Sequence, residues 1–235
     1  MKNKQFNELL LLMSRCRKCS CLRKKNGKDC SLINIYQDQT FCKTIPSIWT
    51  DWFNRIDAKI MVIGQDWGPY SDMKKLNKLY IENSTKDNWD YLIGQEKSTT
   101  KKMLEFYIRE SSNNKYSLNN IFVTNAIMCA RYGNSYRGDN IDLNKSTINC
   151  SEFLLKQIEI VKPKVILTLG YYPLLALSKC YYFEIDRALS NTIKEFPEIQ
   201  LDDFVIIPLY HPVAQIKKSV QLEQYKKIWK YLEDV

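Results

Sequence analysis

Residues 62–70, "VIGQDWGPY", start as an apolar, β-branched strand and end in a turn that holds two glycines, a carboxylate and an indole. Open α/β proteins bind ligands beyond the carboxyl ends of their strands, where turns of this kind lie. Asp66 and the backbone N–H groups around it therefore predict a polar site at the end of this strand. The identity of the ligand has to come from the rest of the chain.

Strand-like and helix-like segments alternate on both sides of this turn. Apolar, β-branched runs predict four strands, at 59–64, 120–126, 163–170 and 204–212. Helical patterns predict helices at 98–110, 146–161, 172–180 and 222–235. The alternation predicts an α/β fold, a three-layer αβα domain around a central four-stranded, mostly parallel sheet. Residues 68–95 and 130–145 are expected to be long loops.

The length and charge of the chain restrict its class. We expect the 235 residues to form one domain, with an N-terminal helix and a cysteine cluster in residues 1–45. The formal net charge of +9 favours an anionic partner, either nucleic acid or an acidic membrane surface, although a lysine-rich codon bias produces the same charge. No apolar run reaches the roughly 18 residues of a membrane span. The apolar run at residues 9–13 is short and is followed by Cys-Arg-Lys-Cys instead of a signal-peptide cleavage site, so we expect a cytoplasmic protein. We also expect it to act as a monomer.

The eight cysteines are unevenly distributed. Cytoplasmic thiols stay reduced, so disulfides are not expected. The spacing Cys16-x2-Cys19 suits a metal ion or an iron–sulfur cluster. A four-thiolate site needs two more ligands, and spacing alone leaves the choice open between nearby and distant cysteines. The nearby pair is Cys21 and Cys30, and the distant pair is Cys129 and Cys150. The later cysteines also fit the role of small core residues.

A residue with a possible functional role lies at or next to the end of each predicted strand. Asp66 follows the first strand, Asn125 lies at the end of the second, Gly170 ends the third, and His211, the only histidine, lies at the end of the fourth. The ends of parallel strands meet at one edge of a sheet. A carboxylate, an amide and an imidazole at one edge predict a small polar pocket. Taken singly, these side chains also fit a helix cap, a turn residue and a structural histidine.

Four segments together resemble the uracil-DNA glycosylase superfamily: "IMVIGQDWG", "FVTNAIMCARYG", "CSEFLLKQIEIVKPKVILTLG" and "VIIPLYHPV". The resemblance runs from Cys16 to about Ile216 and is closest to the iron–sulfur branch, family 4. It implies a DNA repair glycosylase that hydrolyses the N-glycosidic bond of uracil in DNA and leaves an abasic site. It also implies a [4Fe-4S] cluster as cofactor. The residues that match its ligands are Cys16, Cys19, Cys129 and Cys150.

The resemblance also implies roles at the strand ends. Asp66 corresponds to the catalytic group that activates water or stabilises charge, and His211 to the group that supports the uracil O2. Asn125 corresponds to the amide that pairs with the edge of the flipped base. Glycosidic cleavage forms an oxocarbenium-like sugar and an anionic base, and a carboxylate and a histidine suit these charges. The rest of the first turn is expected to bind substrate: Gly64, Gln65, Trp67 and Gly68.

Two motifs depart from the family pattern. Gln65 and Asp66 resemble the family 1 motif, whereas Gly68 resembles the iron–sulfur branch. Trp67 replaces the usual proline, so its indole either stacks on a base or fills space. The aromatic residue that sandwiches uracil is not identified by the sequence. The candidates are Trp67, Tyr70, Trp89 and Tyr91.

The fourth motif reads "HPV" where the family commonly has "HPS". Val213 has no side-chain donor for a DNA phosphate, so that contact must come from backbone N–H groups or from Lys217 and Lys218. Val213 or Ile216 is expected to be the apolar wedge that replaces the flipped base.

Two functions therefore remain open from the sequence. One is a uracil-removing enzyme, and the other is a non-catalytic or differently acting DNA- or base-recognition module on the same fold. A phosphate- or nucleotide-binding protein finds no support, because the chain has neither a G-x-G-x-x-G nor a P-loop pattern.

Overall fold

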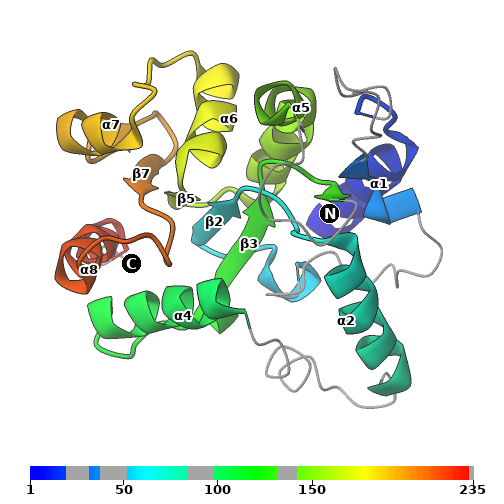
Figure 1. The fold of residues 1–235 in the computed structure, drawn as a ribbon, viewed down its shortest axis with the longest axis horizontal. Coiled ribbons are helices and arrows are strands. Elements are labelled where there is room, and N and C mark those ends of the chain that lie inside the picture. The colour runs from blue at the N-terminus through cyan, green and yellow to red at the C-terminus, as the bar shows by residue number, and fades with distance from the viewer. Residues whose placement is uncertain (20–31, 38–51, 84–97, 132–141, 233–235) are drawn as a thin grey trace.

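A computed structural model describes residues 1–19, 32–37, 52–83, 98–131 and 142–232 (Figure 1). Its central sheet has the strand order β3-β2-β5-β7-β6. The strands are β2 (Ile60–Gly64), β3 (Ile121–Asn125), β5 (Val165–Leu169), β6 (Ile199–Gln200) and β7 (Val205–Leu209). All neighbouring strands are parallel except β6, which pairs antiparallel with β7. The four predicted strands are confirmed. The sequence missed β6 because two residues are too few to show a periodic pattern.

Helices cover both faces of this sheet. They are α1 (Lys2–Arg15), α2 (Tyr70–Asn83), α4 (Thr99–Ser111), α5 (Leu143–Val161), α6 (Tyr171–Tyr181), α7 (Leu189–Glu195) and α8 (Lys218–Lys226). Figure 1 shows α5 and α6 on one side of the sheet and α4 and α8 on the other. Side chains along a strand alternate between the two faces. Met61 and Ile63 pack in the core under α1, α5 and α6, whereas Ile60 and Val62 pack in the core under α4 and α8. The three-layer αβα architecture is confirmed.

An aromatic cluster attaches α1 to the first of these cores. Trp52 stacks on Phe122 of β3 with ring centroids 5.5 Å apart, and its Nε1 donates to the carbonyl oxygen of Val123 at 2.6 Å. Phe6 of α1 packs edge-on against Trp52 at 5.3 Å. Edge-to-face and offset-stacked aromatic pairs stabilise a core beyond their buried area, by about 0.5–1.5 kcal/mol each. The cluster therefore fixes α1, and with it the cysteines that follow this helix, against the sheet.

Several helix boundaries differ from the sequence prediction. Within the expected loop 68–95, residues 70–83 form α2, and residues 84–97 lie outside the described part. Helix α5 begins at Leu143, because Asp142 caps it by accepting from the backbone N–H of Lys145 at 2.9 Å. The expected cap, Ser146, is instead buried inside the helix. The expected last helix divides into α8 and a short 3-10 turn at Trp229–Tyr231.

No helix in the described ranges has both the length and the apolar character that crossing a bilayer requires.

Candidate active site and a cysteine-lined cavity

The turns that follow β2 and β3 are joined by backbone hydrogen bonds. Gly64 and Asn125, the last residues of these strands, face each other in register. Beyond them, three N–H groups of one turn donate to three carbonyl oxygens of the other. The donors are Ala126, Ile127 and Arg131, the acceptors are Gly64, Gln65 and Gly68, and the N···O distances are 2.8, 2.9 and 2.9 Å. The side chains of Asp66 and Asn125 therefore start from two turns that cannot move independently.

Asp66 is the best-held side chain at this edge, and it is only 4% exposed. Its Oδ1 accepts from the backbone N–H of Gly68 at 2.7 Å and from Nε of Arg131 at 3.2 Å. Its Oδ2 accepts from Nε2 of Gln65 at 2.8 Å. A buried carboxylate needs such partners, because desolvation penalises an unpaired charge. Each carboxylate oxygen accepts about two bonds. Among the described residues, these bonds fill Oδ1 and leave one acceptor position on Oδ2.

Gly68 contributes to this arrangement through its backbone. Its φ of +79° lies in the left-handed region, where a glycine avoids the strain that a Cβ imposes. This conformation lets the chain turn back so that the Gly68 N–H reaches the carboxylate of Asp66. The backbone conformation therefore favours glycine at position 68, in addition to the substrate-binding role expected from the sequence.

Asn125 packs directly against Gly64. The asparagine is 8% exposed. A Cβ placed on Gly64 would lie 2.5 Å from Oδ1 of Asn125, closer than real Cβ contacts come. Gly64 is thus a glycine because the amide occupies the space where a side chain would be. The close contact also restricts the positions that the Asn125 amide can adopt.

His211 lies beyond β7 at the same edge of the sheet and is half-buried. The backbone N–H of Val213 donates to its Nδ1 at 3.4 Å. Burial lowers the pKa of His211 below its usual value near 6.5, so the ring is neutral at pH 7. With Nδ1 accepting, a neutral ring carries its proton on Nε2, which is then a hydrogen-bond donor.

The backbone N–H groups after His211 are largely used inside the loop. Besides the bond from Val213, Ala214 donates to the carbonyl oxygen of His211 at 2.8 Å, and Ile216 donates to that of Ala214 at 2.8 Å. These three groups already have acceptors. Of the two sources of phosphate contacts open from the sequence, this geometry favours Lys217 and Lys218.

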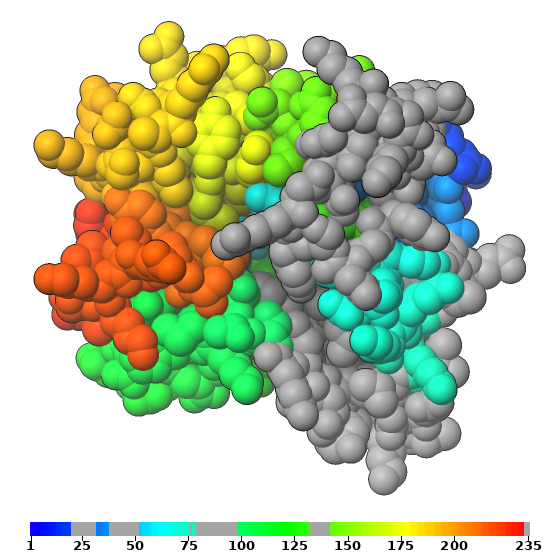
Figure 2. Space-filling model, in the orientation of Figure 1, coloured from blue at the N-terminus to red at the C-terminus, as the bar shows by residue number. Residues whose placement is uncertain are grey.

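The expected DNA-contacting side chains lie on the surface beside α4. Val213 is 44% exposed, Ile216 is half-buried, and Lys217 and Lys218 are exposed. The ammonium of Lys218 is 5.5 Å from the ring centroid of Phe106, an exposed aromatic residue of α4. Figure 2 shows the segment that follows β7 lying against α4 on this face. Val213 is thus the more exposed of the two candidate wedges.

Trp67 points away from this edge and into the core. It is 7% exposed, its Nε1 donates to the carbonyl oxygen of Met128 at 3.0 Å, and its ring centroid is 5.8 Å from that of Trp52. Of the two roles open for the indole, this placement favours filling space over stacking on a base. Tyr70, another candidate for stacking, is half-buried at the start of α2. Trp89 and Tyr91 lie outside the described residues.

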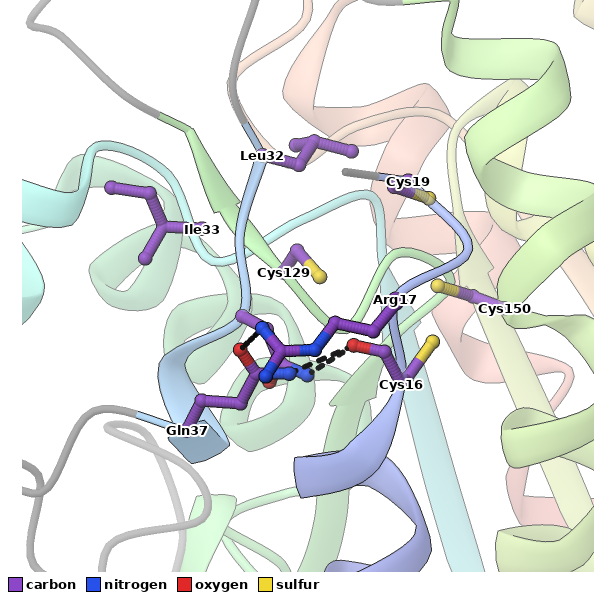
Figure 3. Close-up of a pocket in the computed structure, with 9 residues that line it drawn as sticks. Cys16, Arg17, Cys19, Leu32, Ile33, Gln37, Cys129 and Cys150 are labelled. Atoms are coloured by element: carbon purple, nitrogen blue, oxygen red, sulfur yellow. Dashed lines mark hydrogen bonds between the residues drawn. The ribbon is translucent and has the colours of Figure 1, made fainter. Parts of the chain in front are cut away.

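The four candidate ligands of an iron–sulfur cluster come together around one cavity of about 350 Å³ (Figure 3). Cys16 and Cys19 follow α1, Cys129 precedes β4 (Ala130–Arg131), and Cys150 lies on α5. The remaining lining residues are Arg17, Leu32, Ile33, Asn34 and Gln37. Cys21 and Cys30, the alternative ligands, lie outside the described residues. Cysteines more than a hundred residues apart in the chain thus border the same space.

Hydrogen bonding separates the acidities of these thiols. The Cys150 thiol donates to Cys19, and this bond is the main cause that lowers the pKa of Cys19 to about 6. The same bond, with burial, raises the pKa of Cys150. Burial raises the pKa of Cys129 to about 12. Of Cys19 and Cys150, Cys19 is therefore the thiol that loses its proton more readily, and the thiolate is the form that binds metals.

The four cysteines border the cavity without converging on a point. In the ranges that the structure describes, no three His, Cys, Asp or Glu side chains form a group that could hold a metal ion. The described residues therefore give no support for a site that binds a single metal ion.

A mostly parallel sheet covered by helices on both faces, with an acid, an amide and an imidazole at the carboxyl ends of its strands, defines the chain as a three-layer α/β protein. Residues 50–233 match the family described as the Uracil DNA glycosylase superfamily. The chain belongs to this superfamily, whose members are glycosylase hydrolases that act on DNA. The match starts after Cys16 and Cys19, so it does not assign the chain to the iron–sulfur branch. A comparison with curated proteins found no match.

Arg131 is the residue of this site that the sequence did not reveal. It lies in "CARYG", two residues after Cys129, and no spacing connects it to Asp66, 65 positions earlier. Its side chain is only 12% exposed. The single hint in the sequence is a charged residue directly after the otherwise apolar segment "AIMCA", where a lone charge needs a partner.

Proposed function

We propose that the chain removes uracil from DNA by hydrolysing the N-glycosidic bond and leaving an abasic site. The observation that carries this proposal is the placement of Asp66, Asn125 and His211 beyond parallel strands at one edge of the sheet, in a member of the superfamily. Each of the three is held by contacts that suit one part of this reaction.

Asp66 supplies negative charge to the sugar. Departure of the base leaves an oxocarbenium-like ring, which a nearby carboxylate stabilises. In a buried setting this interaction is stronger than in water. Oδ1 is occupied by the turn and by Arg131, so Oδ2, with its remaining acceptor position, is the atom that faces the sugar or orients the attacking water.

Asn125 and His211 act on the base. Uracil presents an N–H donor beside a carbonyl acceptor, and an amide matches both with its own oxygen and NH2 group. Cytosine presents the opposite pattern at this edge. The Nε2–H of neutral His211 donates to the uracil O2, where negative charge develops as the base leaves.

Lysines beside the site hold the DNA. Lys217 and Lys218 are exposed directly after the His211 loop, and the chain carries a net charge of +9. Contacts to phosphates fix the register of a protein on DNA without reading its sequence. Val213, exposed in the same loop, is the apolar side chain best placed to fill the space of the flipped base.

We also propose that the cysteine-lined cavity holds a [4Fe-4S] cluster. The support is its donor set, because four cysteines are the ligands of such clusters and all four border one space. Cys16, Cys19, Cys129 and Cys150 are the ligands. The bound cluster would tie the segment after α1 to α5 and to the turn before β4, and cluster binding would stabilise the fold.

Iron analysis tests the cluster. Protein purified without oxygen should be brown and contain about four irons per chain. Cys129→Ala should lose the colour and destabilise the protein, whereas Cys180→Ala is the matched control, since Cys180 does not line the cavity. A colourless, fully folded wild-type protein would contradict this part of the proposal.

The activity is tested by gel assay for abasic sites. Wild-type protein is incubated with single- and double-stranded oligonucleotides that contain one uracil, and the abasic sites are cleaved by alkali. Strand cleavage at the uracil, and none in the matched cytosine oligonucleotide, is the expected result. Absence of cleavage in both uracil substrates would sink the proposal.

One observation favours a second candidate, a module that recognises the base without cleaving. The Asp66 carboxylate is almost completely buried and already has three donors, as a purely structural side chain would. The same oligonucleotides distinguish this case. Preferential binding to uracil-containing DNA without any abasic product would identify the recognition module.

A further inference from the structure

We propose that Arg131 is the positioning residue of the reaction, which holds the carboxylate of Asp66 in its productive orientation. This inference rests on the proposed glycosylase function and deepens it. Arg131 does not contact the substrate in this proposal. It acts through Asp66, and its side chain sets which carboxylate oxygen remains available.

The contact geometry carries the first step. Nε of Arg131 lies 3.2 Å from Oδ1 of Asp66, and both side chains are nearly buried, at 12% and 4% exposure. Ion pairs of this kind are screened far less by water and salt than pairs on the surface. The Gly68 N–H reaches the same oxygen at 2.7 Å. Two donors on Oδ1 fix the rotation of the carboxylate and direct Oδ2 away from Arg131.

The backbone of Arg131 is itself held by hydrogen bonds, so its side chain extends from a fixed position. Its N–H donates to the carbonyl oxygen of Gly68 at 2.9 Å, and it forms a parallel bridge with Pro69. On its other side, Arg131 pairs antiparallel with Leu32 of β1 (Leu32–Ile33). Arg131 is thus the point where the catalytic turn, the turn after β3 and β1 meet.

Arginine is the side chain that this task requires. Its planar guanidinium donates in fixed directions, whereas lysine offers a flexible point charge. Loss of the guanidinium leaves one bond on each oxygen, from the Gly68 N–H to Oδ1 and from Gln65 to Oδ2, and the carboxylate is then held less firmly in its orientation. Misplacement of a catalytic group by about 1 Å costs about a hundredfold in rate. The cost should fall on the rate of the chemical step, because DNA affinity comes from other residues.

The experiment compares three variants in single-turnover excision at saturating enzyme. Arg131→Met keeps the length of the side chain and removes the donors, and should slow excision about 30-fold, within the range that such misplacement costs. Arg131→Lys should recover part of this loss. Arg109→Met is the matched control, because it breaks an arginine–glutamate pair on the exposed surface of α4, and it should keep the wild-type rate. DNA affinity should stay within about twofold for all three.

A double-mutant cycle separates positioning from a merely structural role. In the Asp66→Asn background, Arg131→Met should slow excision by no more than about twofold, because the carboxylate that it positions is already gone. Additive losses in the double mutant would overturn the inference, as would a wild-type rate for Arg131→Met. Should Arg131→Met fail to fold, Arg131→Lys carries the same cycle.

The wild-type enzyme distinguishes the two levels of the proposal. If wild type excises uracil and the Arg131 variants match it, only the positioning role is wrong. If wild type excises nothing, the glycosylase function is wrong and the positioning role falls with it.

Discussion

The loops at the carboxyl edge of the sheet differ in how they are built. The turns after β2 and β3 are joined by three backbone hydrogen bonds and bury their polar side chains. The segment after β7 bonds mainly within itself and, beyond the half-buried His211, exposes the side chains of Val213, Lys217 and Lys218. The difference suggests a division of labour. Rigid, buried groups suit chemistry, which needs precise placement, and exposed charged groups suit contact with a long, flexible anion.

This division predicts that binding and chemistry can be lost separately. Substitutions in the joined turns should change the rate of excision and leave DNA affinity intact. Substitutions of the exposed lysines after β7, Lys217 and Lys218, should weaken affinity at any sequence and leave the rate of bound complexes intact.

The largest effect is expected for Asp66→Asn. The substitution keeps the size of the side chain and removes the charge that stabilises the sugar cation. Single-turnover excision of uracil should fall by at least about a hundredfold, the scale of losing a positioned electrostatic or basic group. DNA affinity, measured by fluorescence anisotropy, should change little.

Asp202→Asn is the matched control for this substitution, since it makes the same chemical change at an exposed position beside β6. It should excise at the wild-type rate. Full activity of Asp66→Asn would leave the enzyme in place and remove Asp66 from its mechanism.

Gly64→Ala should have a smaller effect than Asp66→Asn or Arg131→Met. Its Cβ would meet Oδ1 of Asn125 at 2.5 Å and push the amide away from the base. Excision should slow about tenfold, since small displacements of a recognition group are costly. The crowding should also destabilise the fold by about 1–3 kcal/mol, as overpacking does.

A second background tests this cause. In Asn125→Ala, the oxygen that the new Cβ meets is gone, so adding Gly64→Ala should cost almost no further stability in urea unfolding. An equal cost in both backgrounds would show that the close contact is not what requires glycine at this position.

The double substitution Lys217→Glu and Lys218→Glu should act on affinity alone. Each phosphate contact contributes a slope of about 0.9 to the dependence of log K on log salt, so the slope should fall by about two. Lys162→Glu with Lys164→Glu is the matched control. These lysines are exposed just before β5, at the opposite edge of the sheet, and the charge change is the same. Equal salt-dependence slopes for the two double variants would show that net charge lowers the affinity and that Lys217 and Lys218 do not contact phosphates specifically.

The sequence predicted the parts of this molecule that depend on repeated patterns. The four parallel strands and the alternation of layers followed from apolar periodicity, and the strand-end positions of Asp66, Asn125 and His211 followed from the parallel topology. The shared cavity of the four cysteines was expected from the family resemblance, whereas spacing alone had left their partners open.

The rest depends on contacts between distant segments, which no local pattern encodes. The partnership of Arg131 with Asp66 spans 65 positions and arises from the pairing of two turns. The burial of Trp67 depends on Trp52, which packs from a separate segment. Helix α2 was missed because Gly68 and Pro69 at its start favour a loop, and a pattern centred on these residues indicates a turn.

The smallest expected effect concerns pH and the single histidine. Burial lowers the pKa of His211 in the folded protein, so the unfolded chain binds the proton more readily, with a pKa near 6.5. Stability contributed by the neutral ring is therefore complete above about pH 6.5 and is lost as the pH falls toward the folded-state pKa.

His211→Gln removes this titration. The free energy of unfolding is measured in urea at pH 7.5 and at pH 5.5. Its decrease from pH 7.5 to pH 5.5 should be larger for wild type than for His211→Gln. Other groups titrate alike in both proteins, so the difference between the two isolates His211. An identical fall in the two would mean that water reaches the ring freely, and the neutral donor proposed for the uracil O2 would lose its physical basis.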